Sequence, residues 1–234
     1  MTAIADALRE AAALVAGADP ALAAIVALSL QVSLAAVGVA TAVALPLGAL
    51  LAVGRFPGRR ALVVLVNAFM GLPPVVVGLL VYLLLSRAGP LGELGLLFTP
   101  GAMVIAQTLL VLPIVAALCR QAVEDAWREY EEQLRSLGAS GARAALTLVW
   151  DIRFSLVTAV LAGLGRALSE VGAVIIVGGN IEGVTRVMTT AIALETSKGD
   201  LALALALGFI LIALVTLFNA AAQLVKEAAE RRYG

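Results

Sequence analysis

The side chains that could do chemistry in this chain gather in three polar stretches of an otherwise apolar sequence. The first is a charged segment at residues 123–140 (VEDAWREYEEQLRSLGAS), and the second is the opposite pair Arg166 and Glu170 inside an apolar run. The third, at residues 180–190, carries amide and hydroxyl groups. None of them places a general base beside a nucleophile, so they indicate binding and docking rather than catalysis.

Composition argues against several kinds of site. The chain has no histidine and a single cysteine, Cys119, so neither a transition-metal cluster nor an intrachain disulfide is expected. It lacks a phosphate-binding loop of the pattern Gly-x4-Gly-Lys-Ser/Thr, so it is not expected to hydrolyse nucleotide. Its formal net charge is zero, which does not favour nucleic acid as a partner. We expect no enzyme and no cofactor in this chain, with Cys119 a small apolar residue near a helix end.

The elements that must position these groups are membrane-spanning helices. Of the 234 residues, 62% are hydrophobic, and the mean hydropathy is +1.05. A helix crosses the hydrocarbon core with about 20 apolar residues, and backbone in lipid must be helical or form a closed barrel. Strand-like alternation is absent, so an all-α integral membrane protein with five spans is predicted. The spans are residues 22–53, 61–85, 94–118, 156–177 and 201–225.

The distribution of basic residues predicts the orientation. One set of connections holds eleven Lys and Arg residues and the other holds four: Arg55, Arg59, Arg60, Arg120, Arg128, Arg135, Arg143, Arg153, Lys226, Arg231 and Arg232, against Arg9, Arg87, Arg186 and Lys198. The richer side is placed in the cytoplasm. The N-terminus is then outside and the C-terminus inside. An amphipathic extracytoplasmic helix is predicted at residues 1–20, without a cleavable signal, followed by a membrane domain at 21–225 and a cytoplasmic tail at 226–234.

The charged segment is predicted to form a helical hairpin in a cytoplasmic loop at residues 120–153. Glu131 and Arg135 are four residues apart, which supports a helix. Gly138 is a plausible helix stop, and a second short helix can begin near Gly141. Such a segment between membrane spans could be a solvated surface hairpin or the handle by which a soluble partner grips the membrane protein.

Two features inside the predicted spans carry alternatives. Arg166 and Glu170 are four residues apart and would share one helix face, and an isolated charge at mid-bilayer costs about 2.5–3.5 kcal/mol on insertion scales. The pair could be a packing salt bridge or could line a translocation route. Pro73 and Pro74 interrupt the second span, either as a structural kink or as a gate hinge.

The charged segment resembles the EAA loop of ABC-importer permeases. Glu132 and Gly138 have the spacing of six residues that the family pattern requires. The chain departs from that pattern at Gln133, Leu134, Leu148, Trp150 and Asp151. Further along, residues 165–173, 178–181 and 185–192 resemble the molybdate/tungstate branch of these permeases. Residues 194–200, 73–79 and 89–92 look most like tungstate permeases, so the resemblance extends over about residues 20–225.

This resemblance implies a type I ABC-importer (MetI-like) fold in the cytoplasmic (inner) membrane. It implies a homodimer with the pore at its interface, two ABC ATPase subunits that bind ATP and Mg²⁺, and an extracytoplasmic oxyanion-binding protein. Membrane lipid is the remaining partner. The residues expected to couple to the ATPase are Glu129, Glu132, Arg135, Leu137, Gly138, Ala139 and Ser140.

The implied cargo is an oxyanion, with tungstate favoured and molybdate, sulfate or another small anion as alternatives. A dianion in a low-dielectric path needs hydrogen-bond donors, and too many full positive charges would trap it. The candidates for the path or its gate are Pro73, Pro74, Arg166, Glu170, Asn180, Thr185, Thr189 and Thr190, with Ser33 and Thr41 as weaker ones. Tight recognition is expected in the binding protein. A motor-independent channel or secondary transporter is a second class, and nothing positively supports a membrane scaffold or enzyme.

Overall fold

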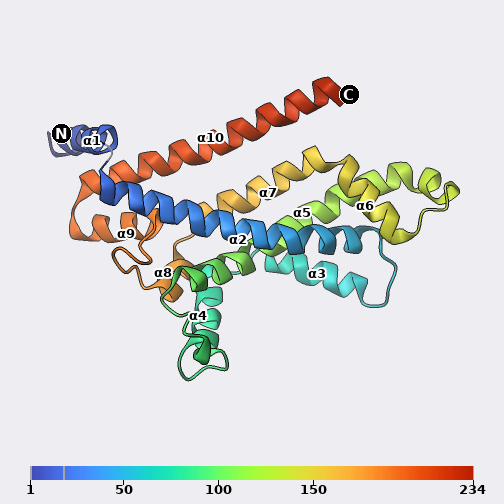
Figure 1. Ribbon diagram of the computed structural model, residues 1–234, viewed down its shortest axis with the longest axis horizontal. Coiled ribbons are helices and arrows are strands. Elements are labelled where there is room, and N and C mark those ends of the chain that lie inside the picture. The colour runs from blue at the N-terminus through green and yellow to red at the C-terminus, as the bar shows by residue number, and fades with distance from the viewer. Residues whose placement is uncertain (1, 18, 234) are drawn as a thin grey trace. The chain divides into compact units, whose positions relative to one another are not determined.

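The computed structural model describes residues 2–17 and 19–233, and all regular elements in this part of the chain are helices (Figure 1). The predicted all-α architecture is confirmed. In chain order the elements are α1 (Thr2–Ala16), α2 (Pro20–Val53), α3 (Arg59–Phe69), α4 (Pro74–Leu85), a 3₁₀ turn η1 (Gly92–Leu94), α5 (Pro100–Ser136), α6 (Gly141–Asp151), α7 (Arg153–Leu168), α8 (Gly172–Gly178), α9 (Met188–Lys198) and α10 (Leu201–Tyr233).

Three helices among the described residues, α2, α5 and α10, are each long and apolar enough to cross a membrane. The count rises to five if the broken pairs α3–α4 and α6–α7 are each one span. The predicted span at residues 156–177 is wrong as a single helix, because α7 ends at Leu168 and α8 begins at Gly172. The helix of the predicted span 94–118 begins only at Pro100.

The chain forms two compact units. Unit 1 comprises Met1–Ala36, Pro73–Gln107 and Ala167–Leu217, and unit 2 comprises Val37–Leu72, Thr108–Arg166 and Phe218–Gly234. Four of the five divisions fall inside α2, α5, α7 and α10, so each of these helices supplies a segment to both units, and the fifth lies between α3 and α4.

The core of unit 1 brings the first two helices of the chain together with the last two. Ala11 of α1, Leu22 of α2, Met188 and Ala191 of α9, and Ala206 and Leu207 of α10 form one buried apolar cluster. In the same unit α4 packs closely on α8. A Cβ added at Gly78 would lie 2.8 Å from the Cα of Ala173, so only glycine permits this approach.

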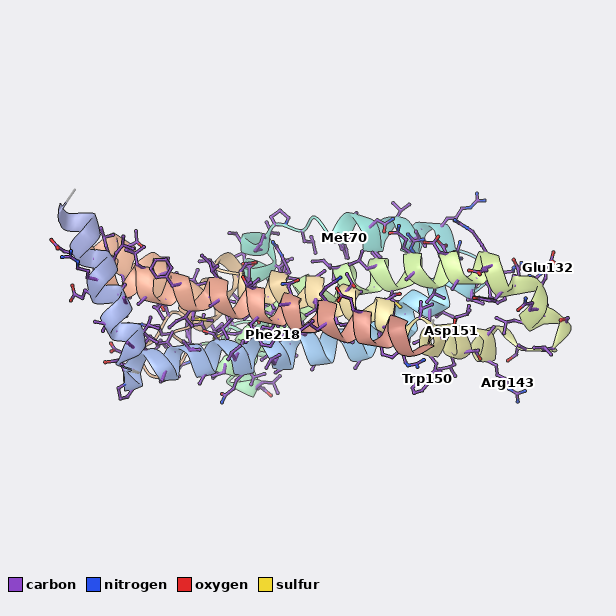
Figure 2. The ribbon with its side chains drawn as sticks, turned by 90° about the horizontal axis from the view of Figure 1, so that it is seen from above. Met70, Glu132, Arg143, Trp150, Asp151 and Phe218 are labelled. Atoms are coloured by element: carbon purple, nitrogen blue, oxygen red, sulfur yellow. The ribbon has the colours of Figure 1, made fainter. Side chains whose placement is uncertain are left out.

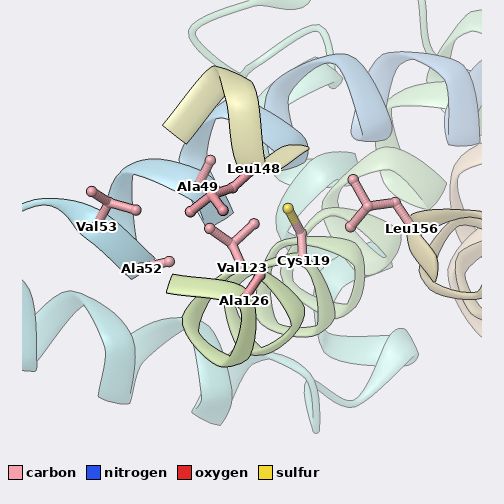
Figure 3. Close-up of a cluster of buried hydrophobic side chains, with 8 residues drawn as sticks. All are labelled: Ala49, Ala52, Val53, Cys119, Val123, Ala126, Leu148 and Leu156. Carbon is pink, nitrogen blue, oxygen red and sulfur yellow. The ribbon is translucent and has the colours of Figure 1, made fainter. Parts of the chain in front are cut away.

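The core of unit 2 holds the short helix α6 against the longer ones (Figure 3). Leu148 of α6 is 2% exposed and packs with side chains of α2, α5 and α7. The cluster consists of Ala49, Ala52, Val53, Cys119, Val123, Ala126, Leu148 and Leu156. Cys119 is buried, as predicted for a small apolar residue, but its predicted place near a helix end is wrong, because it lies in the middle of α5. Burial of Leu148 therefore attaches α6 to α2, α5 and α7.

The N-terminal helix ends earlier than the predicted range 1–20. α1 ends at Ala16, and Asp19 begins α2 as its cap by accepting hydrogen bonds from the backbone N–H groups of Ala21 (2.8 Å) and Leu22 (3.0 Å). Residues 1 and 18 of that predicted range, and residue 234 of the predicted tail, lie outside the described residues.

Candidate functional site

The charged segment forms a hairpin of two helices, here called the α5–α6 hairpin (residues 124–151). α5 continues past its apolar part to Ser136, and Gly138 follows with φ of +72°. The backbone N–H of Ala139 bonds to the carbonyl of Leu134 (3.0 Å), and that of Gly138 bonds to the carbonyl of Arg135 (3.0 Å). This is the Schellman pattern, which satisfies carbonyls at a helix end and favours glycine at the left-handed position. The predicted stop at Gly138 and the second short helix are confirmed.

The tip of the hairpin presents side chains to its surroundings (Figure 2). Glu129, Glu132 and Ser140 are exposed, and Leu137 is 82% exposed. Ala139 is half-buried. Leu137 is therefore an apolar side chain open to solvent at the tip, between exposed polar groups.

Glu132 and Arg135, the last two charged residues of α5, differ in their contacts. Arg135 pairs with Glu131 at 2.5 Å, as its four-residue spacing predicted, and its guanidinium lies 6.0 Å from the ring centroid of Trp127. Glu132 has no ion pair with any residue that the structure describes. Arg135 is thus engaged within its own helix, while the carboxylate of Glu132 is available to a partner.

A group of charges that the sequence analysis treated only as orientation anchors ties the hairpin to α2. The Nε of Arg59 donates to the carbonyl of Leu51 (2.6 Å) at the end of α2, and its Nη2 bonds Glu124 of α5. Glu124 also pairs with Arg120. Outside this group, Arg55 pairs with Glu131 at 3.1 Å. The four-residue spacing of Arg120 and Glu124 was visible in the sequence, but the role of Arg59 depends on a contact 65 positions away.

In unit 1, Glu170 lies in the break between α7 and α8. It is 5% exposed, and its Oε1 accepts a hydrogen bond from the backbone N–H of Ala173 (3.0 Å) in the first turn of α8. The prediction that Arg166 and Glu170 share one helix face is wrong, because the helix that carries Arg166 ends at Leu168. A carboxylate at a helix start stabilises the backbone donors there, which favours a new helix over continuation of the old one.

The three predicted threonines are all buried, and their hydroxyls bond to backbone. Thr185 donates to the carbonyl of Gly178 (2.6 Å) and accepts from the N–H of Ile181 (2.9 Å). Thr189 donates to the carbonyl of Glu170 (2.8 Å), and Thr190 accepts from the N–H of Val187 (3.1 Å). These bonds hold the segment between α8 and α9, so any contact with an anion requires a hydroxyl to change partners.

Asn180 belongs to the same segment. Its φ is +50°, a left-handed conformation that asparagine tolerates better than most residues. Its Nδ2 lies 3.4 Å from the carbonyl of Thr190, a long hydrogen bond that links the segment to α9. The structure therefore brings Asn180, Thr185 and Thr190 together in unit 1.

A small internal cavity of unit 1 lies beside this group. Its volume is about 10 Å³, and its polar lining includes Ser29, Ser33, Gln107 and Thr189. Such a volume holds about one water molecule and is too small for a tetrahedral oxyanion. Two of these residues were missed by the sequence analysis. Gln107 donates to the carbonyl of Ala167 (3.0 Å), and the hydroxyl of Ser29 accepts from the N–H of Met188 (2.7 Å).

The signal that could have identified Gln107 was its side-chain amide inside the apolar run 94–118, since a polar group at membrane depth needs a partner.

The prolines of the second span begin a helix. Pro73 precedes α4 and Pro74 is its first residue, where the missing N–H costs nothing. α3 ends at Phe69, so the interruption covers residues 70–73. This geometry is compatible with a fixed kink and with a hinge.

The model of the family "binding-protein-dependent transport system inner membrane component" matches residues 44–232. The chain is 44% identical over 204 residues to a probable anion ABC transporter permease protein of Haloferax volcanii (85% of this chain, 88% of the relative). It is 41% identical over 217 residues to the tungstate uptake system permease protein TupB of Peptoclostridium acidaminophilum (93% and 95%). It is 41% identical over 165 residues to TupB of Campylobacter jejuni (70% and 69%).

Relatives named for sulfate or molybdenum transport are 29–32% identical. The family match covers most of the chain, and the three relatives above are matched over two thirds or more of their own length. Long apolar helices, as expected of an integral membrane protein, accompany these matches. The chain belongs to the family of binding-protein-dependent transport system inner membrane components, the permease subunits of ABC transporters.

Proposed function

We propose that this chain is the transmembrane subunit of an ATP-driven importer for an oxyanion, with tungstate as the favoured cargo. It would work as a homodimer with two ATPase subunits on the cytoplasmic side and an extracytoplasmic oxyanion-binding protein. The observation that carries the proposal is the α5–α6 hairpin, which has an exposed tip and a base packed into the core of unit 2.

The hairpin has the properties of a lever. Leu148 joins it to α2, α5 and α7 through buried contacts, and Arg59 joins it to the end of α2 through ion pairs and carbonyl bonds. A packed core transmits displacement because it resists deformation. Closure of the ATPase dimer on ATP would move the tip, and the spans would then rock between outward and inward access. In this proposal Glu132 contacts a basic residue of the ATPase, and Gly138 permits the turn. Glu129, Arg135, Leu137, Ala139 and Ser140 complete the coupling surface.

An orientation with the N-terminus outside, the C-terminus inside and five spans agrees with two contacts. Arg55, in the connection between α2 and α3, pairs with Glu131 of α5, and Arg59, the first residue of α3, pairs with Glu124 of α5. Both segments therefore lie at the same membrane surface. The chain must then cross the membrane an even number of times between residues 60 and 120, as α3–α4 and the apolar part of α5 would do. In unit 1, Ala11 packs with Met188 and Ala191 of α9, so α1 and α9 lie together and are proposed to face outside.

The anion is proposed to pass without a tight site in this chain. The cavity of about 10 Å³ in unit 1 is too small to store a tetrahedral anion. Backbone and hydroxyl donors near Asn180, Thr185, Thr189 and Thr190 could contact the anion briefly as the segment moves. Pro73, Pro74, Arg166 and Glu170 would form the path or its gate. Affinity would reside in the binding protein, which would deliver the anion.

Tungstate is favoured by the comparisons. The relatives named for tungstate uptake are 41% identical, against 29–32% for those named for molybdenum or sulfate. Molybdate is the second candidate, because the two anions have the same charge and shape and could pass through the same machine.

The test reconstitutes the chain in liposomes with its partner ATPase and oxyanion-binding protein. We expect ATP hydrolysis to be stimulated by the binding protein loaded with tungstate and less by the same protein loaded with molybdate or sulfate. Equal stimulation by tungstate and molybdate would favour a general oxyanion importer. Uptake that proceeds without ATP, in a chain that binds no ATPase, would contradict the proposal and support a channel or secondary transporter.

A further inference from the structure

An apolar groove in unit 2 runs between α2 and the consecutive helices α6 and α7. It has a volume of about 420 Å³, and its walls include Leu45 of α2, Val149 of α6, and Val157 and Leu161 of α7. A second hollow of about 430 Å³, between α2 and α6, shares Leu45 and Val149 with it. The groove is a continuous apolar surface that the described side chains of unit 2 leave open.

One end of the groove carries a cation in an unusual setting. Arg153, the first residue of α7, also lines the groove, and its Nη1 donates to the carbonyl of Trp150 (2.7 Å) at the end of α6. The guanidinium lies 4.7 Å from the ring centroid of Trp150 and 4.5 Å from that of Phe154. Trp150 is 71% exposed. The two aromatic rings therefore fix the direction of a charged planar group beside an apolar surface.

We propose that this groove binds one anionic phospholipid, with the phosphate on Arg153 and an acyl chain along α7. Guanidinium groups match the geometry of phosphate oxygens with two parallel donors. An arginine together with a tryptophan, placed where polar sequence gives way to apolar sequence, is typical of the membrane interface. α6 and α7 meet at such a junction, because the charged hairpin ends there and the apolar part of α7 begins.

The dimensions and the charge favour a lipid as the occupant. From Arg153 to Leu161 the helix rises about 12 Å, which is comparable to most of one acyl chain within a leaflet of about 15 Å of hydrocarbon. The groove wall along this length is aliphatic, as an acyl chain requires. The positive charge at its end selects an anionic head group over a zwitterionic one.

The lipid is placed at a mechanically relevant point. Leu156 of α7 and Leu148 of α6 belong to the buried cluster that connects the α5–α6 hairpin to α2, and Leu156 also lines the groove. A lipid in the groove would therefore support the joint between α6 and α7, where the two helices meet at 79°.

The experiment measures lipid retained by the full-length chain. The chain is purified in mild detergent with the partners that accompany it, incubated with equal amounts of phosphatidylglycerol and phosphatidylcholine, washed, and analysed by native mass spectrometry. We expect the wild type to retain phosphatidylglycerol in preference. Arg153→Gln should reduce that preference about tenfold, the effect of losing a charge-assisted hydrogen bond. Val160→Trp, which fills the groove, should reduce retention of both lipids.

Arg143→Gln is the matched control, since Arg143 is an exposed arginine of α6 that does not line the groove. It should retain phosphatidylglycerol as the wild type does. If Arg153→Gln does not assemble, Arg153→Lys replaces it, because lysine keeps the charge but loses the planar fork. Arg153→Lys should show an intermediate preference for phosphatidylglycerol. Together with Val160→Trp it then tests the proposal. Unchanged retention in these variants would overturn the proposal. So would a disulfide between two copies of the Val157→Cys variant in membranes, because a second chain would then occupy the groove.

Discussion

Gly138 and Glu132 lie six residues apart in the α5–α6 hairpin. Each is proposed to take part in coupling for a different physical reason. Gly138 is required by its backbone, because its φ of +72° is costly for any residue with a Cβ. Glu132 is available because it is exposed and has no ion pair among the described residues. The hairpin thus combines a glycine that its backbone requires with an exposed carboxylate.

Replacement of Gly138 by alanine should destabilise the turn by about 1–2 kcal/mol, the cost of a left-handed conformation for a residue with a Cβ. No heavy atom lies within 4 Å of the added Cβ, so the effect is purely conformational. The measurement is amide hydrogen exchange of residues 134–144. Gly141→Ala is the control, because Gly141 also has open space but begins a helix, and exchange there should stay unchanged or slow. Equal exchange in the two variants would contradict the argument.

Replacement of Glu132 by lysine should abolish stimulation of ATP hydrolysis while membrane insertion is preserved. Reversal of a charge that meets a basic partner costs several kcal/mol, so a loss of at least about tenfold is expected. Stimulated hydrolysis in liposomes is the readout. Asp125→Lys is the control, since Asp125 is exposed on the same helix but pairs with Arg128 at 3.4 Å. Normal stimulation in the Glu132 variant would remove this residue from the coupling surface.

At the scale of elements, close packing and ion pairs decide which helices are held together. Arg59, the first residue of α3, joins the end of α2 to α5, because its donors reach Leu51 and Glu124. Glu124 receives a second arginine, Arg120, so its carboxylate is held between two cations. These groups are largely shielded from water, with side chains 15–29% exposed, which makes their pairing stronger than that of surface charges.

Arg59→Gln should therefore destabilise the protein by about 1.5–3 kcal/mol, since hydrogen bonds to charged groups are worth that much. Arg55→Gln is the matched control. Arg55 lies four residues before Arg59, in the connection between α2 and α3. Its side chain is 75% exposed, so its pair with Glu131 should contribute less than about 1 kcal/mol. Thermal unfolding of the purified chain distinguishes the two variants. The interpretation fails if Arg55→Gln proves the more damaging change.

For the whole molecule, the decisive property is which segments of the chain face the cytoplasm. The count of basic residues predicts that the α5–α6 hairpin faces inward and that the segment after α9 faces outward. The pairs formed by Arg55 and Arg59 agree with this arrangement, since they require two segments on the same membrane surface.

Single cysteines introduced at Ser140 and Ser197 test this orientation. Both serines are exposed, and the native Cys119 is buried, so it should not react with a membrane-impermeant thiol reagent. In intact cells Ser197→Cys should be labelled and Ser140→Cys should be protected until the membrane is opened. The reverse pattern would invert the topology and place the hairpin where no ATPase could reach it.

Local sequence alone determined much of this protein. Apolar runs of spanning length determine the long helices α2, α5 and α10, because burial in lipid depends on the length and hydrophobicity of each segment by itself. The stop at Gly138, the pair of Glu131 and Arg135 and the burial of Cys119 also follow from short-range spacing and residue type.

Tertiary structure alone decided the rest. The four-residue spacing of Arg166 and Glu170 predicted that they share one helix face. In the structure α7 ends at Leu168, before Glu170, and the carboxylate of Glu170 accepts a hydrogen bond at the start of α8. Arg59 bonds Glu124, Gln107 bonds the carbonyl of Ala167, and Ser29 accepts from the N–H of Met188. These partners lie 65, 60 and 159 positions away, at separations that no local pattern encodes. Polar groups buried at membrane depth must find partners wherever the fold places them, so their roles are set by packing between distant segments.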